Sequence, residues 1–189
     1  MNKEVLLIPG MNKLAGGVTA RVKLERPHEN VIAGDTALHE GGHAILLLVR
    51  GRHLRRASRI PGDGYLGITE GEVDAVSAMG PDALGHSGTG FDRRVARYFV
   101  SDIGTAAAVA KDTIYENWAA FHALSRAIEA EGEVSGHRAK QVIEEDKNPK
   151  ALVEMNGPMG LKSFVMATRE VDGFIVPLIL SEPVEERNN

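Results

Sequence analysis

The chain has 189 residues, of which 43% are hydrophobic and 25% charged, as is usual for a globular domain that buries a core of its own. Its formal net charge of −4 argues against a general nucleic-acid binder, because binding to phosphates needs a basic surface. The sequence has no cysteine and no apolar run of the roughly 20 residues that span a bilayer, which excludes disulfide bonds, thiolate metal ligands and a transmembrane helix.

Residues 1–34 predict an N-terminal β segment. Glu4–Ile8 is a short strand candidate that ends at Pro9, and the alternating pattern of Val18–Leu24 indicates a second strand. The apolar part of the first strand is too short for the core of a signal peptide. We therefore expect a soluble, cytoplasmic protein that does not act at a membrane.

The stretch at 35–48, DTALHEGGHAILLL, contains the motif around which the chain is organised. Asp35 is a suitable N-cap and the leucines and isoleucine that follow form an apolar face, so the stretch predicts a helix. His39 and His43 are four residues apart and project from the same face, where both imidazoles can reach one zinc ion. Glu40 is then not a ligand and can accept and donate protons. We interpret the motif as a zinc site; the alternative is a chance pattern on a buried helix.

Two glycines occupy the middle of this predicted helix. Gly41 and Gly42 each cost roughly 1 kcal/mol relative to alanine in a helix interior. Their presence therefore indicates a close approach by another backbone or by a substrate.

The segment after this helix predicts short elements and loops. Tyr65–Thr69 is a candidate hairpin or edge strand, which could hold an extended peptide by adding it to the sheet or could serve the fold alone. Val73–Met79 predicts a short helix that ends at Gly80. Gly85–Asp92 is a glycine-rich loop, and it leads into a helix whose apolar residues recur at helical spacing.

The apolar residues from Thr105 to about Ala130 predict one long amphipathic helix that stops near Gly132. Ser135 is a candidate cap for a shorter helix. We therefore expect residues 35–147 to form a helical domain. His122 and His137 have no partner at ligand spacing, and we interpret them as bystanders; His28 is interpreted as a solvated loop residue.

The C-terminal residues 148–189 predict a β-hairpin and a tail. Ser163–Ala167 and Phe174–Leu180 are the two strands, and Pro177 indicates that the second one lies at a sheet edge. The acidic tail from Glu182 to Asn189 is expected to be frayed.

A catalytic zinc needs about three protein ligands and one open position for water. With His39 and His43 assigned, the third ligand is a carboxylate or histidine further along the chain. Spacing alone does not select it from six candidates: Glu70, Glu72, Asp74, Asp82, His86 and Asp92.

Several short runs resemble, in the same order, motifs of the FtsH-type ATP-dependent zinc peptidases. Ala37–Ala44 resembles the H-E-A-G-H-A helix of that family. Further runs resemble its I-P-R-G and L-G-x-T strand, its G-R-A-A-E helix and its G-A-S-N-D loop: Arg59–Pro61, Leu66–Thr69, Met79–Pro81 and Gly88–Asp92. In the family the aspartate that closes this loop is the third zinc ligand, which implies Asp92 here. The resemblance covers roughly residues 35 to 145, whereas Asp82-Ala83-Leu84 replaces the family's Ala-Ala-Glu and no P-loop ATPase motif occurs.

These observations lead us to expect an α+β fold, mainly α, with a zincin-like FtsH-type peptidase helical domain and small β-hairpins. The expected function is that of a zinc metalloendopeptidase that hydrolyses polypeptides, with Zn²⁺ held by His39, His43 and Asp92 and with Glu40 as the general base. A homo-oligomer or a separate ATPase partner is expected to assist it. The alternative is a catalytically inactive FtsH-peptidase-like module that acts through protein–protein contacts.

Overall fold

The computed structural model describes residues 19–86, 88–157, 160–171 and 174–178. Over these residues the chain is mainly helical, with seven helices, and it also contains antiparallel sheets, so the expected α+β class is confirmed. The chain divides into two compact units, which we call the helical unit (His28–Glu144) and the sheet unit (Met1–Pro27 with Glu145–Asn189). No helix in the described part of the chain is long and apolar enough to cross a membrane.

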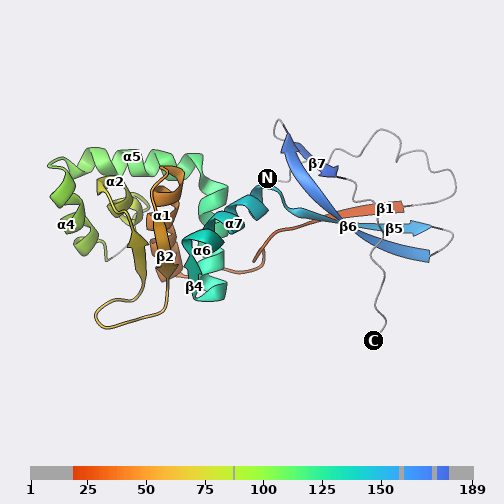
Figure 1. Ribbon diagram of the computed structural model, residues 1–189, viewed down its shortest axis with the longest axis horizontal. Coiled ribbons are helices and arrows are strands. Elements are labelled where there is room, and N and C mark those ends of the chain that lie inside the picture. Colours follow the sequence, from red (N-terminus) through yellow and green to blue (C-terminus); the bar gives the residue numbers. More distant parts are fainter. Residues whose placement is uncertain (1–18, 87, 158–159, 172–173, 179–189) are drawn as a thin grey trace. The chain divides into compact units, whose positions relative to one another are not determined.

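The helical unit consists of short elements gathered around helix α1. In chain order they are α1 (Asp35–Val49), β2 (Leu54–Ser58), β3 (Ile68–Gly71), α2 (Ala75–Ala78), α3 (Gly80–Ala83), α4 (Gly90–Phe99), α5 (Ile103–Glu116), α6 (Trp118–Glu131), β4 (Glu133–Ser135) and α7 (Gly136–Lys147). Helices α2, α3, α5 and α6 and strands β2 and β3 all contact α1 (Figure 1). The three strands form an antiparallel sheet in the order β3-β2-β4.

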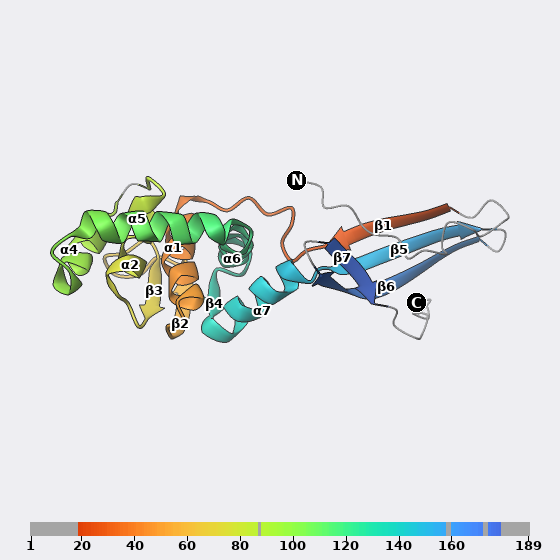
Figure 2. The same ribbon diagram turned by 90° about the horizontal axis from the view of Figure 1, so that it is seen from above.

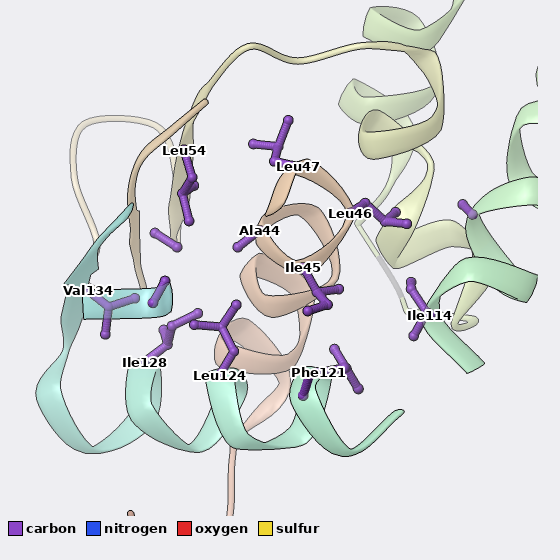
Figure 3. Packing of buried hydrophobic residues seen from close by; sticks show 14 of the residues in the cluster. Ala44, Ile45, Leu46, Leu47, Leu54, Ile114, Phe121, Leu124, Ile128 and Val134 are labelled. Atoms are coloured by element: carbon purple, nitrogen blue, oxygen red, sulfur yellow. The ribbon is translucent and has the colours of Figure 1, made fainter. Parts of the chain in front are cut away.

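The core of this unit forms where α1 packs along α6. Ile45 and its two leucine neighbours on α1 are fully buried, and Ile45 faces Phe121 and Leu124 of α6 (Figure 3). Leu46 packs toward Gly80 of α3, and Leu47 packs toward Gly71 of β3. Burying each such side chain stabilises the fold by roughly 1.5–3 kcal/mol. The apolar half of α1 is thereby fixed, which holds its histidine-bearing half in place.

The two glycines of the central motif are explained by close packing inside the protein. A Cβ atom on Gly41 would collide with Ser125 of α6. Gly42 faces Gly80, where a Cβ atom would lie 2.6 Å from the carbonyl oxygen of Gly42. The expected close approach is therefore that of neighbouring elements of the chain, α6 and α3.

We predict that Gly80→Ala lowers the free energy of unfolding by about 1–3 kcal/mol, because its Cβ atom would meet rigid backbone at Gly42. Gly90→Ala is the matched control, since a Cβ atom at Gly90 has no neighbour within 4 Å. Urea unfolding of both variants measures the difference. Equal stability of the two variants would contradict the close contact.

Two predicted details of the helices are wrong. Residues 105–130 form two helices, α5 and α6, because Asn117 leaves the helical conformation and its side chain donates a hydrogen bond to the carbonyl of Thr113 at the end of α5. The N-cap of α1 is Gly34, and Asp35 is the first residue of the helix.

The predicted short helix at Val73–Met79 is present as α2 (Ala75–Ala78) and ends before Gly80, as expected. Gly80-Pro81 then begins the next helix, α3, because proline is tolerated in the first turn of a helix. The predicted cap at Ser135 is confirmed, since its Oγ accepts a hydrogen bond from the backbone N–H of Arg138.

The sheet unit is a four-stranded antiparallel sheet in the order β1-β5-β6-β7 (Figure 2). Its strands are β1 (Thr19–Glu25), β5 (Lys150–Gly157), β6 (Gly160–Val171) and β7 (Phe174–Leu178). The expected strand at Val18–Leu24, the C-terminal hairpin and the edge position of Pro177 are confirmed. The strand candidate Glu4–Ile8 and the tail after Leu178 lie outside the described residues. The pairing of β1 with β5 joins the two ends of the chain and was not expected.

Candidate metal centre

Three of the sequence-predicted site residues come together in the helical unit. Helix α1 presents His39 and His43 one turn apart, and Asp92 lies in the first turn of α4. The distance from His39 Nε2 to Asp92 Oδ2 is 3.2 Å, and that from His43 Nε2 to Asp92 Oδ1 is 3.5 Å. One ligand atom from each of the three side chains lies within 4.8 Å of the others.

These separations fit a single metal ion. A tetrahedral zinc with bonds of about 2.0–2.1 Å to nitrogen and oxygen holds its ligand atoms about 3.3 Å apart. The contacts of 3.2 and 3.5 Å from the two histidines to the two oxygens of Asp92 are close to that value. The cluster of His39, His43 and Asp92 could therefore bind a metal.

A backbone contact orients His43 for this role. Its Nδ1–H donates a hydrogen bond of 2.7 Å to the carbonyl oxygen of Ser77, since a carbonyl can only accept. When the ring is neutral, its lone pair is therefore on Nε2, which faces Asp92 and is free to bind a metal. Ser77 is itself held in α2 by a capping box with Asp74.

The carboxylate of Asp92 is held in its charged form. Burial alone would raise its pKa, but hydrogen bonds with His39 and His43 and their positive charge outweigh burial and lower the pKa to about 2. An ionised carboxylate is the form that binds a metal.

Asp82 holds the start of α4, the helix that carries Asp92. The Oδ1 atom of Asp82 accepts hydrogen bonds from Thr89 Oγ1 at 3.0 Å and from Arg93 Nε at 2.7 Å. Thr89 precedes α4, and Arg93 follows Asp92 directly. Asp82 thus ties the start of α4 to α3.

We predict that Asp82→Ala weakens zinc binding about tenfold, because a residue that supports a ligand commonly costs about 10- to 100-fold in metal affinity when it is removed. Asp102→Ala is the control, since Asp102 caps α5 in a similar way and does not contact the cluster. Competition with a chromophoric chelator gives both affinities. An unchanged affinity in Asp82→Ala would contradict a supporting role.

The other candidates for the third ligand are engaged elsewhere. Glu70 pairs with Arg55 and Arg56, the carboxylate of Glu72 accepts the backbone N–H of His53, and Asp74 caps α2 and pairs with Arg50. The remaining candidate, His86, lines the same cavity as the cluster, with its ring centroid 6.4 Å from that of His39.

Three histidines that were not predicted as metal ligands make contacts outside the cluster. His28 contacts Glu131, His122 packs against Trp118, and the His137 ring is 3.1 Å from Gln141.

Glu40 lies beside the cluster and is only 5% exposed. Its Oε2 atom accepts a hydrogen bond of 2.7 Å from the hydroxyl of Thr69 on β3. Burial raises the pKa of Glu40 above its ordinary value, although the Thr69 hydroxyl and the nearby histidines oppose the shift. Glu40, the two histidines and Asp92 all line one cavity of about 930 Å³.

This raised pKa predicts a pH-dependent gain in stability for Glu40→Gln. A carboxyl whose pKa is raised by folding contributes stability below its ordinary pKa of 4.5, and this contribution is lost as the pH rises through the folded value. The metal-free Glu40→Gln variant cannot ionise there. Its stability relative to wild type should therefore increase as the pH rises above 4.5 in urea unfolding, whereas a constant difference would contradict the raised pKa.

The chain matches no protein-family model and no curated protein with which it was compared. The resemblance to FtsH-type peptidases therefore remains a prediction from short motifs, and the function has to be argued from the site.

Sequence reasoning missed the residues that support the site. The carbonyl of Ser77 has no sequence signal, because every residue carries one. Asp82 was considered as a ligand and supports the start of α4 instead. Thr69 was part of a motif, but its contact with Glu40 depends on how β3 meets α1.

Proposed function

We propose that this protein is a zinc-dependent metalloendopeptidase. The observation that supports it most is the convergence of His39, His43 and Asp92 at a cavity that also contains the buried Glu40. A catalytic zinc has three protein ligands and an open position for water. In H-E-x-x-H enzymes the glutamate beside the first histidine acts as the general base.

The donor set and Glu40 together favour zinc. Imidazole and carboxylate donors bind zinc, but two histidines and one carboxylate also hold iron(II) in oxygenases. A carboxylate buried beside the ligands is useful for hydrolysis, which needs a base to take a proton from water.

The proposed mechanism assigns a role to each residue of the site. When bound to His39, His43 and Asp92, zinc would lower the pKa of a bound water toward about 7 and polarise the scissile carbonyl. Glu40 takes the proton from the attacking water and passes it to the leaving amine. Burial raises the pKa of Glu40 in the direction that suits this exchange, because a proton carrier works best when its pKa is near the working pH.

The substrate is proposed to be an extended polypeptide. Strand β3 is at the end of the β3-β2-β4 sheet, and Ile68 and Thr69 line the cavity. A peptide could add to this edge by backbone hydrogen bonds. Leu47, Val73 and Val95 give the cavity apolar walls for side chains. An ATPase that unfolds folded substrates is part of the proposal, since these 189 residues contain no P-loop.

The experiment that tests this proposal combines metal analysis with cleavage of unstructured peptides. We expect about one zinc per chain in the purified protein, and cleavage of a peptide library that 1,10-phenanthroline abolishes and added zinc restores. Iron in place of zinc would overturn the assignment of the metal. A zinc-loaded protein that leaves every peptide intact would favour the inactive protein-binding module.

A further inference from the structure

Thr69 directs one oxygen of the Glu40 carboxylate. Its Oγ1 atom is 2.7 Å from Glu40 Oε2 and 3.2 Å from the Glu40 carbonyl oxygen. A hydroxyl has a single proton, and a carboxylate can only accept, so the shorter contact is the hydrogen bond to Oε2. Oε1 receives no hydrogen bond from any residue in the described part of the chain.

Gly67 leaves space for the other oxygen. A Cβ atom at Gly67 would lie 2.8 Å from Glu40 Oε1 and 2.9 Å from Glu40 Cγ, and it would also press on Thr36. Any residue other than glycine would therefore push against the carboxylate. Gly67, Glu40 and Thr69 all line the cavity that contains the metal cluster.

The strand that carries Thr69 is a rigid support. Thr69 pairs with Ala57 of β2, and Ala57 is fully buried. A β-branched side chain on a paired strand has little rotational freedom, so the hydroxyl is held in one direction before any substrate binds.

We propose that Thr69 and Gly67 are positioning residues that give the two oxygens of the Glu40 carboxylate different roles. Thr69 holds Oε2 by a hydrogen bond, and Gly67 leaves the space in which Oε1 transfers the proton. This inference rests on the proposed function. An O–H bond of the attacking water breaks, its proton moves to Oε1, and the electron pair forms the bond to the carbonyl carbon. The proton on Oε1 then moves to the amide nitrogen as the C–N bond breaks and leaves with the free amine.

The first test compares Thr69→Val with Thr69→Ser in the zinc-loaded full chain. Valine has the shape of threonine without the hydroxyl, whereas serine keeps the hydroxyl. We expect Thr69→Val to lower kcat about 10- to 100-fold with KM and zinc affinity within about twofold of wild type. Thr69→Ser should recover most of kcat. Thr113→Val is the control, because the Thr113 hydroxyl binds only the Val109 carbonyl on an exposed face of α5.

A loss of kcat that serine restores supports the inference, since a purely structural role of Thr69 would also change KM or zinc affinity. A Thr69→Val protein with wild-type kcat would overturn it. So would a Thr69→Ser protein as slow as Thr69→Val.

The second test does not depend on activity. Crystal structures of Thr69→Val and Gly67→Ala should show the Glu40 carboxylate displaced from its wild-type position, with the backbone of β3 unchanged. An undisplaced carboxylate in both variants would overturn the inference. If the zinc-loaded wild type cleaves no peptide, the proposed function fails, and these structures alone decide whether Thr69 and Gly67 position Glu40.

Discussion

Glu40→Gln is expected to bind zinc as tightly as wild type and to cleave peptides at least about a hundredfold more slowly. Glutamine fills the same buried space, and its side-chain oxygen can still accept the hydrogen bond from Thr69. It cannot take a proton from water near neutral pH. General base catalysis contributes typically about 10²- to 10⁴-fold, and a loss in that range is therefore expected in kcat.

The measurement is a pair of titrations on the same preparation: zinc affinity by competition, and kcat and KM for one peptide found in the library. Glu116→Gln is the control, because it replaces the same carboxylate with an amide at an exposed residue at the end of α5. A Glu40→Gln protein that cleaves at the wild-type rate would remove Glu40 from the mechanism and leave the cluster as a metal site of another kind.

The parts of the site that sequence could predict are those set by local geometry. His39 and His43 share a helix face because four residues make about one turn, and α1 has the expected apolar side. Asp92 is different, since it lies on another helix and was implied only by the order of family-like motifs. Asp92 lies near the histidines because of the packing of α2 and α3 and the contacts of Asp82. A local sequence pattern cannot predict these contacts.

The parts of the fold that sequence missed have physical reasons of the same kind. The apolar spacing continues through Asn117, so the pattern predicts one helix where the amide side chain ends α5. Arg55 and Arg56 were not assigned to any element from the sequence; the structure places them in strand β2 and pairs them with acidic residues of the neighbouring strands. The pairing of β1 with β5 joins residues more than a hundred positions apart, such as Glu25 and Lys150. A pattern among neighbouring residues of the sequence cannot predict such a pairing.

Asp92→Ala is expected to weaken zinc binding by more than about a hundredfold, which is beyond the usual effect of residues that merely support a ligand. The change removes one of three donors and the only negatively charged one in the cluster. His39 and His43 would remain on α1, because the burial of the apolar face holds the helix without help from Asp92. The fold should therefore survive and the metal site should not.

The competition titration that measures this loss needs two comparisons. Asp112→Ala removes an aspartate from the exposed surface of α5 and should bind zinc like wild type. Asp92→Ala combined with His86→Ala tests the remaining candidate ligand, since His86 lines the same cavity. If Asp92→Ala keeps wild-type affinity and only the double variant loses it, His86 is the third ligand. In that case the FtsH-like order of motifs misassigns the site, although the chemistry of two histidines with Glu40 beside them would stay the same.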